Sequence, residues 1–274
     1  MKAISTTARL NNGVEIPFLG LGVYLARAGD QAQNAVKWAL EAGYRHIDTA
    51  KFYANERDVG EAVRASVVPR AEVFVTTKLW NSDHGYEQAL QAFEGSYNAL
   101  GLDYVDLYLI HWPVEGKRAE SWRALLEIYA TDKCRAIGVS NYTVRHLEEL
   151  LASSPVIPVV NQVEFHPFLF QKDLLDYCRA HDIQLQAYSP LTKGQRLNDP
   201  NISRVAEKYG KSNAQIMIRW ALQHDVVVIP KSSNRERIRE NAAVFDFQIA
   251  DEDMAFLDSL DESWRCTWDP NGVR

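Results

Sequence analysis

Short strand-like stretches alternate with amphipathic helical stretches over the whole of this 274-residue chain, and no other feature restricts its fold as strongly. The strand-like stretches are rich in β-branched and aromatic residues, whereas the helical ones repeat apolar residues every three to four positions. We predict eight strands. The second ends at residue 47, and the others span residues 18–23, 73–78, 104–111, 135–140, 159–163, 183–188 and 226–229. We predict helices at 31–42, 56–66 (with Asn55 as N-cap), 86–100, 119–130, 144–152, 172–181, 202–209, 213–223, 235–241 and 254–260.

Eight strands that alternate with helices, without a long linker, predict a (β/α)8 TIM barrel. We expect it to form a single domain that spans residues 1–274. Residues 9–17 precede the first strand and are typical of an N-terminal β-hairpin. Within them Asn12-Gly13 favours a two-residue turn between the two hairpin strands.

A doubly wound parallel sheet is the competing fold. If it bound a dinucleotide, it would carry the pattern G-x-G-x-x-G directly after its first strand. Gly20 and Gly22 supply two of these glycines, but Leu25 stands at the third position and no helix is predicted to start there. The barrel therefore remains the better prediction.

Composition and charge argue against several classes of binding partner. Hydrophobic residues make up 46% and charged residues 24%, as in globular proteins. The net charge of −6, with both signs spread along the chain, argues against a nucleic-acid partner. No apolar run reaches membrane-spanning length and residues 1–7 lack an apolar signal core, so we predict a cytoplasmic protein without a membrane partner. The three cysteines are far apart, which predicts neither a disulfide framework nor a structural metal site.

Polar residues of different chemistry stand at the ends of three successive predicted strands. Asp48 follows the second strand, Lys78 closes the third and His111 closes the fourth, while Tyr53 comes five residues after Asp48. The strand ends of a parallel barrel open onto the face that carries the active site, so we expect the four side chains to meet there. Any one of them could instead be a helix cap or a solvated loop residue. All four together predict a catalytic group.

These residue types fit the protonation of a carbonyl oxygen during reduction. A phenol has a pKa near ~10, and the ammonium of Lys78, held by Asp48, is expected to lower the pKa of Tyr53. His111 can donate a hydrogen bond to the same oxygen and orient the carbonyl. The sequence offers no nucleophile with a base beside it and no H-E-x-x-H metal pattern. A hydride donor from outside the protein is then required, which predicts a nicotinamide cofactor.

The chain resembles the aldo-keto reductases over nearly its whole length. The motifs that carry the resemblance are G-Y-R-H-I-D-T-A at 43–50, L-D-Y-V-D-L-Y-L-I-H-W-P at 102–113, G-V-S-N-Y at 138–142 and I-P-K-S at 229–232. T-K-L-W-N at 77–81 is similar to the short-tailed group of 2,5-diketogluconate reductases and trypanosomatid prostaglandin F synthases. The resemblance implies NADPH-dependent reduction of aldehydes and ketones. It also implies that Asp48, Tyr53, Lys78 and His111 are catalytic, with Tyr53 as the proton donor.

The resemblance implies a cofactor site as well. Polar residues after strands five and six resemble those that bind the nicotinamide carboxamide, and an aromatic residue after strand seven resembles the one on which the ring stacks. Cations and hydroxyls after strand eight, at the start of a helix, are suited to the 2′-phosphate of NADPH. The implied cofactor residues are Gly22, Val23, Asp48, Ser140, Asn141, Gln162, Tyr188, Ser189, Leu191, Lys231, Ser232, Ser233, Arg237, Glu240 and Asn241.

Four aromatic residues resemble the substrate pocket of the family. They are Tyr24, Phe52, Trp80 and Trp112, and His111 adjoins them. Long C-terminal loops narrow this pocket in many relatives, whereas the segment after Trp264 is short here, so we expect a more open pocket. The resemblance leaves a sugar-derived ketone, methylglyoxal, a lipid aldehyde and a prostaglandin endoperoxide open as substrates.

Two other functions compete with carbonyl reduction. One is a non-catalytic subunit that senses NADP(H), and the complete set of four polar residues argues against it. The other is a barrel hydrolase, and the lack of metal-ligand patterns argues against it. We predict an enzyme that acts on a small-molecule carbonyl substrate as a monomer, without a metal ion.

Overall fold

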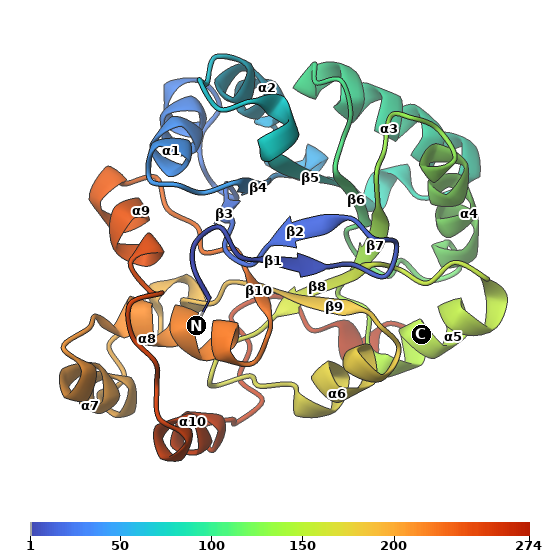
Figure 1. Cartoon of the computed structure of the whole chain (residues 1–274). Coiled ribbons are helices and arrows are strands. Elements are labelled where there is room, and N and C mark those ends of the chain that lie inside the picture. Colours follow the sequence, from blue (N-terminus) through green and yellow to red (C-terminus); the bar gives the residue numbers. More distant parts are fainter. Residues whose placement is uncertain (1) are drawn as a thin grey trace.

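The structure, a computed structural model, describes residues 2–274. Within that range eight parallel strands form one sheet, in the order β3 to β10 along the chain. Bridges between Leu19 and Val228 and between Gly22 and Lys231 join its two edges, so the sheet closes into a barrel. Figure 1 views this barrel with the helices arranged around the strands. The predicted (β/α)8 barrel is confirmed, and the doubly wound sheet is wrong.

The observed strands and helices lie within three residues of their predicted bounds. The barrel strands are β3 (Leu21–Gly22), β4 (His46–Asp48), β5 (Phe74–Leu79), β6 (Leu107–Ile110), β7 (Ile137–Ser140), β8 (Val160–Glu164), β9 (Gln184–Tyr188) and β10 (Val227–Val228). The helices are α1 (Asp30–Glu41), α2 (Glu56–Arg64), α3 (Tyr86–Leu100), α4 (Arg118–Tyr129), α5 (Val144–Ser153), α6 (Lys172–Ala180), α7 (Pro200–Tyr209), α8 (Asn213–Gln223), α9 (Arg235–Ala242) and α10 (Asp251–Asp258). Of the helices in residues 2–274, none is both long enough and apolar enough to traverse a membrane.

The predicted N-terminal hairpin is confirmed, but its turn is one residue longer than predicted. Strands β1 (Thr7–Arg9) and β2 (Glu15–Pro17) pair in antiparallel register. The main-chain N–H of Leu10 donates to the oxygen of Val14, and that of Gly13 to the oxygen of Leu10, each at 2.8 Å. Gly13 has a φ of 86°, which makes residues 11–13 a three-residue loop that ends in a glycine in the left-handed region.

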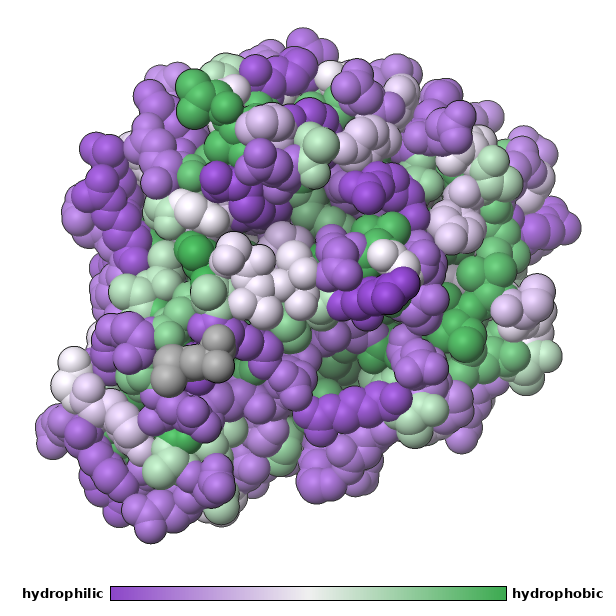
Figure 2. Space-filling view, viewed as in Figure 1, coloured by the Kyte–Doolittle hydropathy of each residue, from purple (hydrophilic) through white to green (hydrophobic). Residues whose placement is uncertain are grey.

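The hairpin covers one end of the barrel. It crosses the near end of the barrel in Figure 1, and Leu10, Ile16 and Phe18 bury their side chains beneath it. Figure 2 shows that hydrophobic residues on this face form small groups among hydrophilic ones. The hairpin therefore closes this end, and access to the barrel interior is left to the end where the strands terminate.

Inward-facing polar residues fill part of the barrel in two layers. Strand residues two apart point to the same side of the sheet. Each layer inside the barrel is therefore made of one inward-facing residue from each of several strands. His46 lies in the layer nearer the hairpin, where its Nε2 is 3.3 Å from Thr76 Oγ1 and 3.5 Å from Gln186 Nε2. Asp48 and Lys78, each two residues further along their strands, lie in the next layer toward the strand ends. The fold thus carries a polar core up to the open end.

Asn55 precedes α2 as predicted, but its side chain does not cap that helix. Its Oδ1 accepts the Thr49 hydroxyl at 2.7 Å, and its Nδ2 donates to the main-chain oxygens of Val23 and Ala26 at 3.1 and 3.0 Å. The capping prediction is wrong because three partners in the loops after β3 and β4 compete for the amide. The result is a buried tie between the two loops that border the open end of the barrel.

Candidate active site

A cleft of about 1090 Å³ opens at the carboxyl ends of the barrel strands. Its volume lies just above the usual range for small-molecule and cofactor pockets. Residues distant in the sequence line it, from the loops after β3, β4 and β9 to the start of α9 and the last residues of the chain. Barrel enzymes hold their reactive groups at this end of the strands.

Asp48 and Lys78 form a buried ion pair beneath the cleft. The Nζ of Lys78 donates to Asp48 Oδ1 at 2.6 Å and to the main-chain oxygen of Thr49 at 2.8 Å. The second carboxylate oxygen, Oδ2, accepts Nε2 of Gln162 at 2.7 Å. Strands β4, β5 and β8 therefore meet in one hydrogen-bonded group, in which each charge has a partner.

Burial works against both charges of this pair. It raises the pKa of Asp48, which the charge and hydrogen bond of Lys78 oppose, and it lowers the pKa of Lys78, which Asp48 opposes. Removing one partner of such a pair leaves an uncompensated buried charge, which costs about 3–5 kcal/mol. Each of the two charges is therefore stabilised by the other, and strands β4, β5 and β8 fix the positions of the groups.

Tyr53 lies above the pair on a short 3-10 helix, Lys51–Tyr53, that follows β4. The Nζ of Lys78 is 5.0 Å from the centroid of the Tyr53 ring. The prediction that Lys78 lowers the pKa of this phenol is wrong for the structure, because burial, followed by the charge of Asp48, raises the pKa of Tyr53 well above 10. The ammonium is paired with Asp48, so the two charges largely offset each other at the phenol. Tyr53 therefore keeps its proton at neutral pH.

His111 packs edge-on against Tyr53 and is uncharged. The ring centroids are 5.7 Å apart at an interplanar angle of 75°. Burial, helped by the positive charge of Lys78, holds the pKa of His111 well below its usual 6.5. Its Nδ1 is buried and has no hydrogen-bond partner within residues 2–274. Since His111 also lines the cleft, the other ring nitrogen, Nε2, is the one available to a molecule bound there.

The four predicted aromatic residues line one side of the cleft. Phe52 and Trp80 stack with their ring centroids 3.8 Å apart, and Trp80 lies 5.2 Å from His111. Tyr24 packs 5.0 Å from Tyr53. Aromatic faces at these separations form an apolar wall directly beside the two groups that can contact a polar oxygen.

A chain of hydrogen bonds crosses the other side of the cleft. The hydroxyl of Tyr188 donates to Asn141 Oδ1 at 2.7 Å, and Asn141 Nδ2 donates to the main-chain oxygen of His111 at 3.0 Å. Asn141 has a φ of 63°, in the left-handed region that asparagine tolerates better than most residues. Together with Gln162, these residues present amide and aromatic groups opposite the aromatic wall.

The far end of the cleft meets the first turn of α9. Ser232 accepts the N–H of Asn234 at 3.2 Å, and Asn234 caps the helix by accepting the N–H of Arg237 at 3.0 Å. Lys231 lies 3.4 Å from the hydroxyl of Ser233. Two cations, two hydroxyls and a helix N-terminus thus converge at one end of the cleft, an arrangement that favours a phosphate group.

Comparison with known proteins agrees with this geometry. The sequence profile of the Aldo/keto reductase family matches residues 19–262. The chain belongs to the aldo/keto reductase family. The resemblance predicted from its motifs is confirmed, and the chain is an oxidoreductase of that family.

Relatives of this aldo-keto reductase cover nearly its whole length. It is 51% identical to the glyoxal reductase of Bacillus subtilis over 269 residues, which span 98% of each chain. It is 51% identical to the 9,11-endoperoxide prostaglandin H2 reductase of Trypanosoma cruzi over 265 residues, 96% of this chain and 94% of that one. An aldo-keto reductase of Bombyx mori, solved in complex with NADP, superposes with a TM-score of 0.90 at 37% identity and covers 97% of this chain and 95% of its own.

Most residues predicted to touch cofactor or substrate line the cleft. They are Gly22, Tyr24, Asp48, Phe52, Tyr53, Trp80, His111, Trp112, Asn141, Gln162, Tyr188, Ser189, Leu191, Lys231, Ser232, Ser233, Arg237, Glu240 and Asn241. Val23, Lys78 and Ser140 are buried behind its wall instead. Val23 donates its N–H to the oxygen of Asp48 at 3.0 Å, and Ser140 donates its hydroxyl to the oxygen of Gln162 at 2.8 Å. These two residues therefore support the residues that line the cleft.

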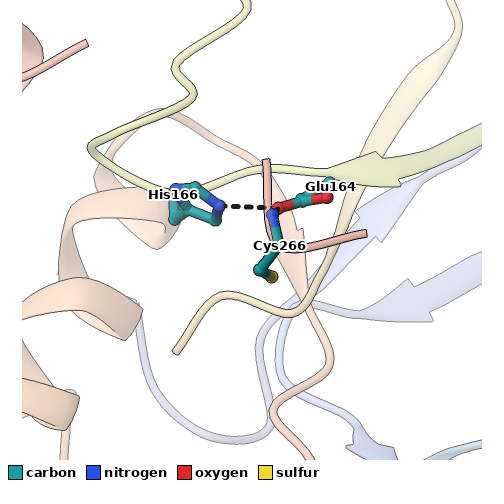
Figure 3. A group of neighbouring side chains, drawn as sticks. All are labelled: Glu164, His166 and Cys266. Carbon is teal, nitrogen blue, oxygen red and sulfur yellow. Dashed lines mark hydrogen bonds and ion pairs between the residues drawn. The ribbon is translucent and has the colours of Figure 1, made fainter. Parts of the chain in front are cut away.

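Sequence reasoning missed the contribution of the last residues of the chain. Cys266, Thr267 and Trp268 line the cleft, so the short C-terminal segment forms part of its wall. Glu164 and His166 lie against this segment, and Figure 3 shows them next to Cys266. Glu164 lies two residues after Gln162 on the same strand, which could have placed it on the inner side of the barrel. Its partners, about a hundred residues away, carry no local signal.

Proposed function

We propose that this aldo-keto reductase reduces the carbonyl group of small aldehydes and ketones, with NADPH as the hydride donor. The observation that carries the proposal is the protonated Tyr53 phenol beside neutral His111, above the buried Lys78–Asp48 pair and next to an aromatic wall. A proton donor and a hydrogen-bond donor that converge without a nucleophile suit the reduction of a bound carbonyl.

The residues of the cleft fit NADPH. Lys231 and Arg237, with the hydroxyls of Ser232 and Ser233, have the chemistry to hold a phosphate at the N-terminus of α9. Amide groups and an aromatic ring at the opposite end suit a nicotinamide. A relative that was solved in complex with NADP supports the same cofactor. When bound, NADPH supplies the hydride that reduces the carbonyl carbon. Of the cofactor residues predicted from the sequence, those that line the cleft are proposed to contact NADPH. Val23 and Ser140 support these residues from behind.

Each catalytic residue has a distinct task in the proposed reaction. His111 donates a hydrogen bond from Nε2 and orients the carbonyl oxygen, and Tyr53 gives that oxygen its proton. An alkoxide is a much stronger base than a phenolate, so this transfer is favourable even from a phenol with a raised pKa. Lys78, which lies beneath the ring and is paired with Asp48, offsets the carboxylate charge that would otherwise oppose the phenolate that remains.

The substrate class follows from the wall beside Tyr53. Tyr24, Phe52, Trp80 and Trp112 offer flat apolar faces, and a carbonyl compound with an aromatic or short aliphatic body fits between them. Two relatives are named for the reduction of glyoxal and of prostaglandin H2. We include small dicarbonyl compounds and prostaglandin endoperoxides among the candidate substrates, because two relatives, each 51% identical to this chain, carry these names.

We further propose that the chain works as one domain and as a monomer. All groups of the proposed site come from a single chain, and the barrel runs from its first strand to its last without a break in the sheet. The predictions of a cytoplasmic location and of a reaction without a metal ion belong to the same proposal. Light scattering of the purified protein measures the oligomeric state.

The test is the absorbance of NADPH during reaction with 4-nitrobenzaldehyde, for wild type and for Tyr53→Phe. The substitution removes one hydroxyl and keeps the ring that packs against Tyr24 and His111. We expect kcat to fall by about 10²-fold or more, within the usual range for general acid catalysis. The dissociation constant for NADPH, measured by fluorescence titration, should change little.

Three outcomes count against the proposal. Near-normal turnover in Tyr53→Phe would show that another group supplies the proton. A wild-type protein that binds NADPH but reduces no compound in a panel of aldehydes, ketones and endoperoxides would support a cofactor-sensing subunit instead. Loss of NADPH binding in Tyr53→Phe would place the hydroxyl in the cofactor site rather than in catalysis.

A further inference from the structure

Glu164 has no task in the reaction proposed above, yet its carboxylate is surrounded by donors. It ends β8 and is fully buried. Its oxygens accept the main-chain N–H groups of Cys266 at 2.7 Å and of Thr267 at 3.1 Å, Nε2 of His166 at 3.0 Å, and the hydroxyl of Thr267. Figure 3 shows Glu164 at the end of β8 together with His166 and with Cys266 of the C-terminal segment. Four donors on one buried carboxylate make it an anchor for that segment.

The cluster fits an anion that holds main chain better than a metal site. Burial alone would raise the pKa of Glu164, but the hydrogen bonds from His166, Thr267 and Cys266 outweigh it and lower the pKa to about 2. The ligand atoms of Glu164, His166 and Cys266 lie close enough together for one metal ion. However, four donors already occupy the carboxylate oxygens, and Nε2 of His166 is used for one of these hydrogen bonds.

The anchor is connected to the proposed catalytic residues through Thr267. The hydroxyls of Thr267 and Tyr188 lie 3.0 Å apart, and Tyr188 donates to Asn141 at 2.7 Å. Asn141 in turn donates to the main-chain oxygen of His111 at 3.0 Å. The Thr267 hydroxyl gives its proton to Glu164 and the Tyr188 hydroxyl gives its proton to Asn141, so their 3.0 Å approach is a contact between two oxygens. Through that contact a continuous series of side chains links Glu164, along the side of the cleft opposite the aromatic wall, to His111 beside Tyr53.

The residue after Thr267 reaches across the cleft to the aromatic wall. The ring of Trp268 lies 6.2 Å from that of Trp80 and 5.9 Å from that of Trp112. Its side chain is 60% exposed, so these neighbours alone hold it loosely. Its main chain, in contrast, follows directly on two residues that Glu164 fixes. The position of the Trp268 ring therefore depends on that anchor.

A second set of contacts fixes the other end of the same segment. Arg118 on α4 donates to the main-chain oxygen of Arg274 at 2.7 Å. Arg145 and His146 on α5 contact the main-chain oxygen of Val273, the latter at 3.0 Å. The C-terminal end lies beside α5 in Figure 1. Residues 266–274 are thus held at both ends, with Trp268 next to the Glu164 end.

We propose that Glu164 is a positioning residue that holds residues 266–274 over the cleft and thereby sets the affinity for bulky carbonyl substrates through Trp268. The part of this inference that concerns substrates rests on the proposed function. The part that concerns the anchoring of the main chain does not, so the two can be tested separately.

Amide hydrogen exchange tests the anchor without any substrate. Glu164→Gln keeps the shape of the side chain but removes the negative charge that accepts the two N–H groups. We expect peptides covering residues 264–269 to exchange about tenfold faster or more, the loss expected when hydrogen bonds to a charged group are removed. Peptides from β5 and β6 should keep their rates. Glu94→Gln is the matched control, because Glu94 forms an exposed ion pair with Lys133 on the outside of the barrel.

Kinetics test the link to substrate through a double-mutant cycle. With 4-nitrobenzaldehyde, Glu164→Gln should raise KM by about tenfold and change kcat less than about threefold, since the proton donor is untouched. In a Trp268→Ala background the same substitution should change KM by less than about twofold, because the ring that Glu164 positions is gone. With glyoxal, which is too small to need Trp268, the KM of Glu164→Gln should stay near that of wild type.

The outcomes separate the anchor from the proposed function. Unchanged exchange of residues 264–269 in Glu164→Gln overturns the anchor. A similar fall in kcat and rise in KM for both substrates would show a general structural role of Glu164 and overturn the link to specificity. The same holds if Glu164→Gln changes KM as strongly in the Trp268→Ala background as in the wild type. If the wild type reduces no carbonyl, the proposed function fails, while the exchange experiment still decides whether Glu164 holds the segment.

Discussion

In the proposed reaction, the proton on Tyr53 is held by the surroundings of the phenol. Burial, Asp48 and the neighbouring tyrosines all raise its pKa. Lys78 is close enough to matter, but its hydrogen bonds go to Asp48 and Thr49, so its charge is shared with the carboxylate. Its charge therefore offsets that of Asp48 at the phenol and does not lower the pKa of Tyr53 below its ordinary value. The residue types predicted which groups meet; the sign of the pKa shift depends on distances and burial.

Cofactor choice is decided at single residues near α9. NADPH and NADH differ by one phosphate, and Lys231 and Arg237 are the cations of the cleft that can contact it at the start of that helix. Hydrogen bonds to charged groups contribute about 1.5–3 kcal/mol each, although solvent screening reduces this at an exposed site. We expect Arg237→Ala to raise the Kd for NADPH by about tenfold or more and to leave the Kd for NADH nearly unchanged.

A residue two positions earlier provides the control for this prediction. Arg235 lies in the same first turn of α9, but it pairs with Glu41 at 3.1 Å and does not line the cleft. Arg235→Ala should leave both dissociation constants unchanged. The measurement is a fluorescence titration of both cofactors at two salt concentrations, at which NADPH binding to Arg237→Ala should depend less on salt. Equal losses for the two cofactors would assign Arg237 to the adenine or to the fold.

At the scale of elements, two glycines inside helices distinguish two contributions to stability: close packing between helices and the intrinsic helix preference of a residue. Gly60 lies inside α2, where an added Cβ would stand 1.8 Å from the main-chain oxygen of Leu100 at the end of α3. Gly95 lies inside α3, and an added Cβ there would meet nothing within 4 Å. Gly60→Ala should therefore lower the free energy of unfolding by about 2 kcal/mol or more. Gly95→Ala should raise it by about 0.5–1 kcal/mol.

Thermal unfolding followed by circular dichroism measures both variants under one condition. For a chain of this size we expect Tm to fall by about 4 °C or more in Gly60→Ala and to rise by about 1–3 °C in Gly95→Ala. Shifts of the same sign in both variants would show that helix preference outweighs the contact between α2 and α3. A neutral Gly60→Ala would show that α2 can move away from Leu100 at little cost.

Element positions followed from the sequence more closely than the contacts between elements did. The period of the apolar residues predicted α3 at its observed bounds, Tyr86–Leu100. The cap predicted at Asn55 failed because its amide finds partners in loops that are distant in the sequence. The turn at Asn12-Gly13 gained a residue because Leu10 and Val14 pair across it. Local patterns thus predict where elements lie, and long-range hydrogen bonds decide what side chains at their ends do.

For the whole molecule, closure of the barrel explains which parts of the site could be foreseen. Asp48, Lys78 and His111 stand at strand ends, and a barrel brings all strand ends together, so their meeting follows from topology. Trp268 reaches the cleft because Glu164 holds the segment before it, and no period or motif links positions a hundred residues apart. The polar layer around His46 was likewise hidden, since single polar residues inside strands do not reveal their partners.

That polar layer predicts how the whole molecule responds to acid. His46 is fully buried, and burial, opposed by the main chain of Pro17 and assisted by the charge of Lys78, lowers its pKa from 6.5 to about 3. Between these two values the unfolded chain binds a proton at His46 that the folded chain refuses. The contribution of His46 to stability is therefore complete above pH 6.5 and is lost as the pH falls toward 3.

The loss attributable to His46 alone can be measured against His46→Gln. At pH 5, which is 1.5 units below the unfolded pKa, linkage gives a loss of about 2 kcal/mol, because each unit corresponds to about 1.36 kcal/mol. His46→Gln keeps a polar side chain opposite Thr76 and Gln186 but has no proton to gain. We expect urea unfolding to show that the wild type loses about 2 kcal/mol more than the variant between pH 8 and pH 5, whatever their difference at pH 8. Parallel stability profiles over this range would mean that His46 accepts a proton inside the folded barrel, and the lowered pKa of His46 would be wrong.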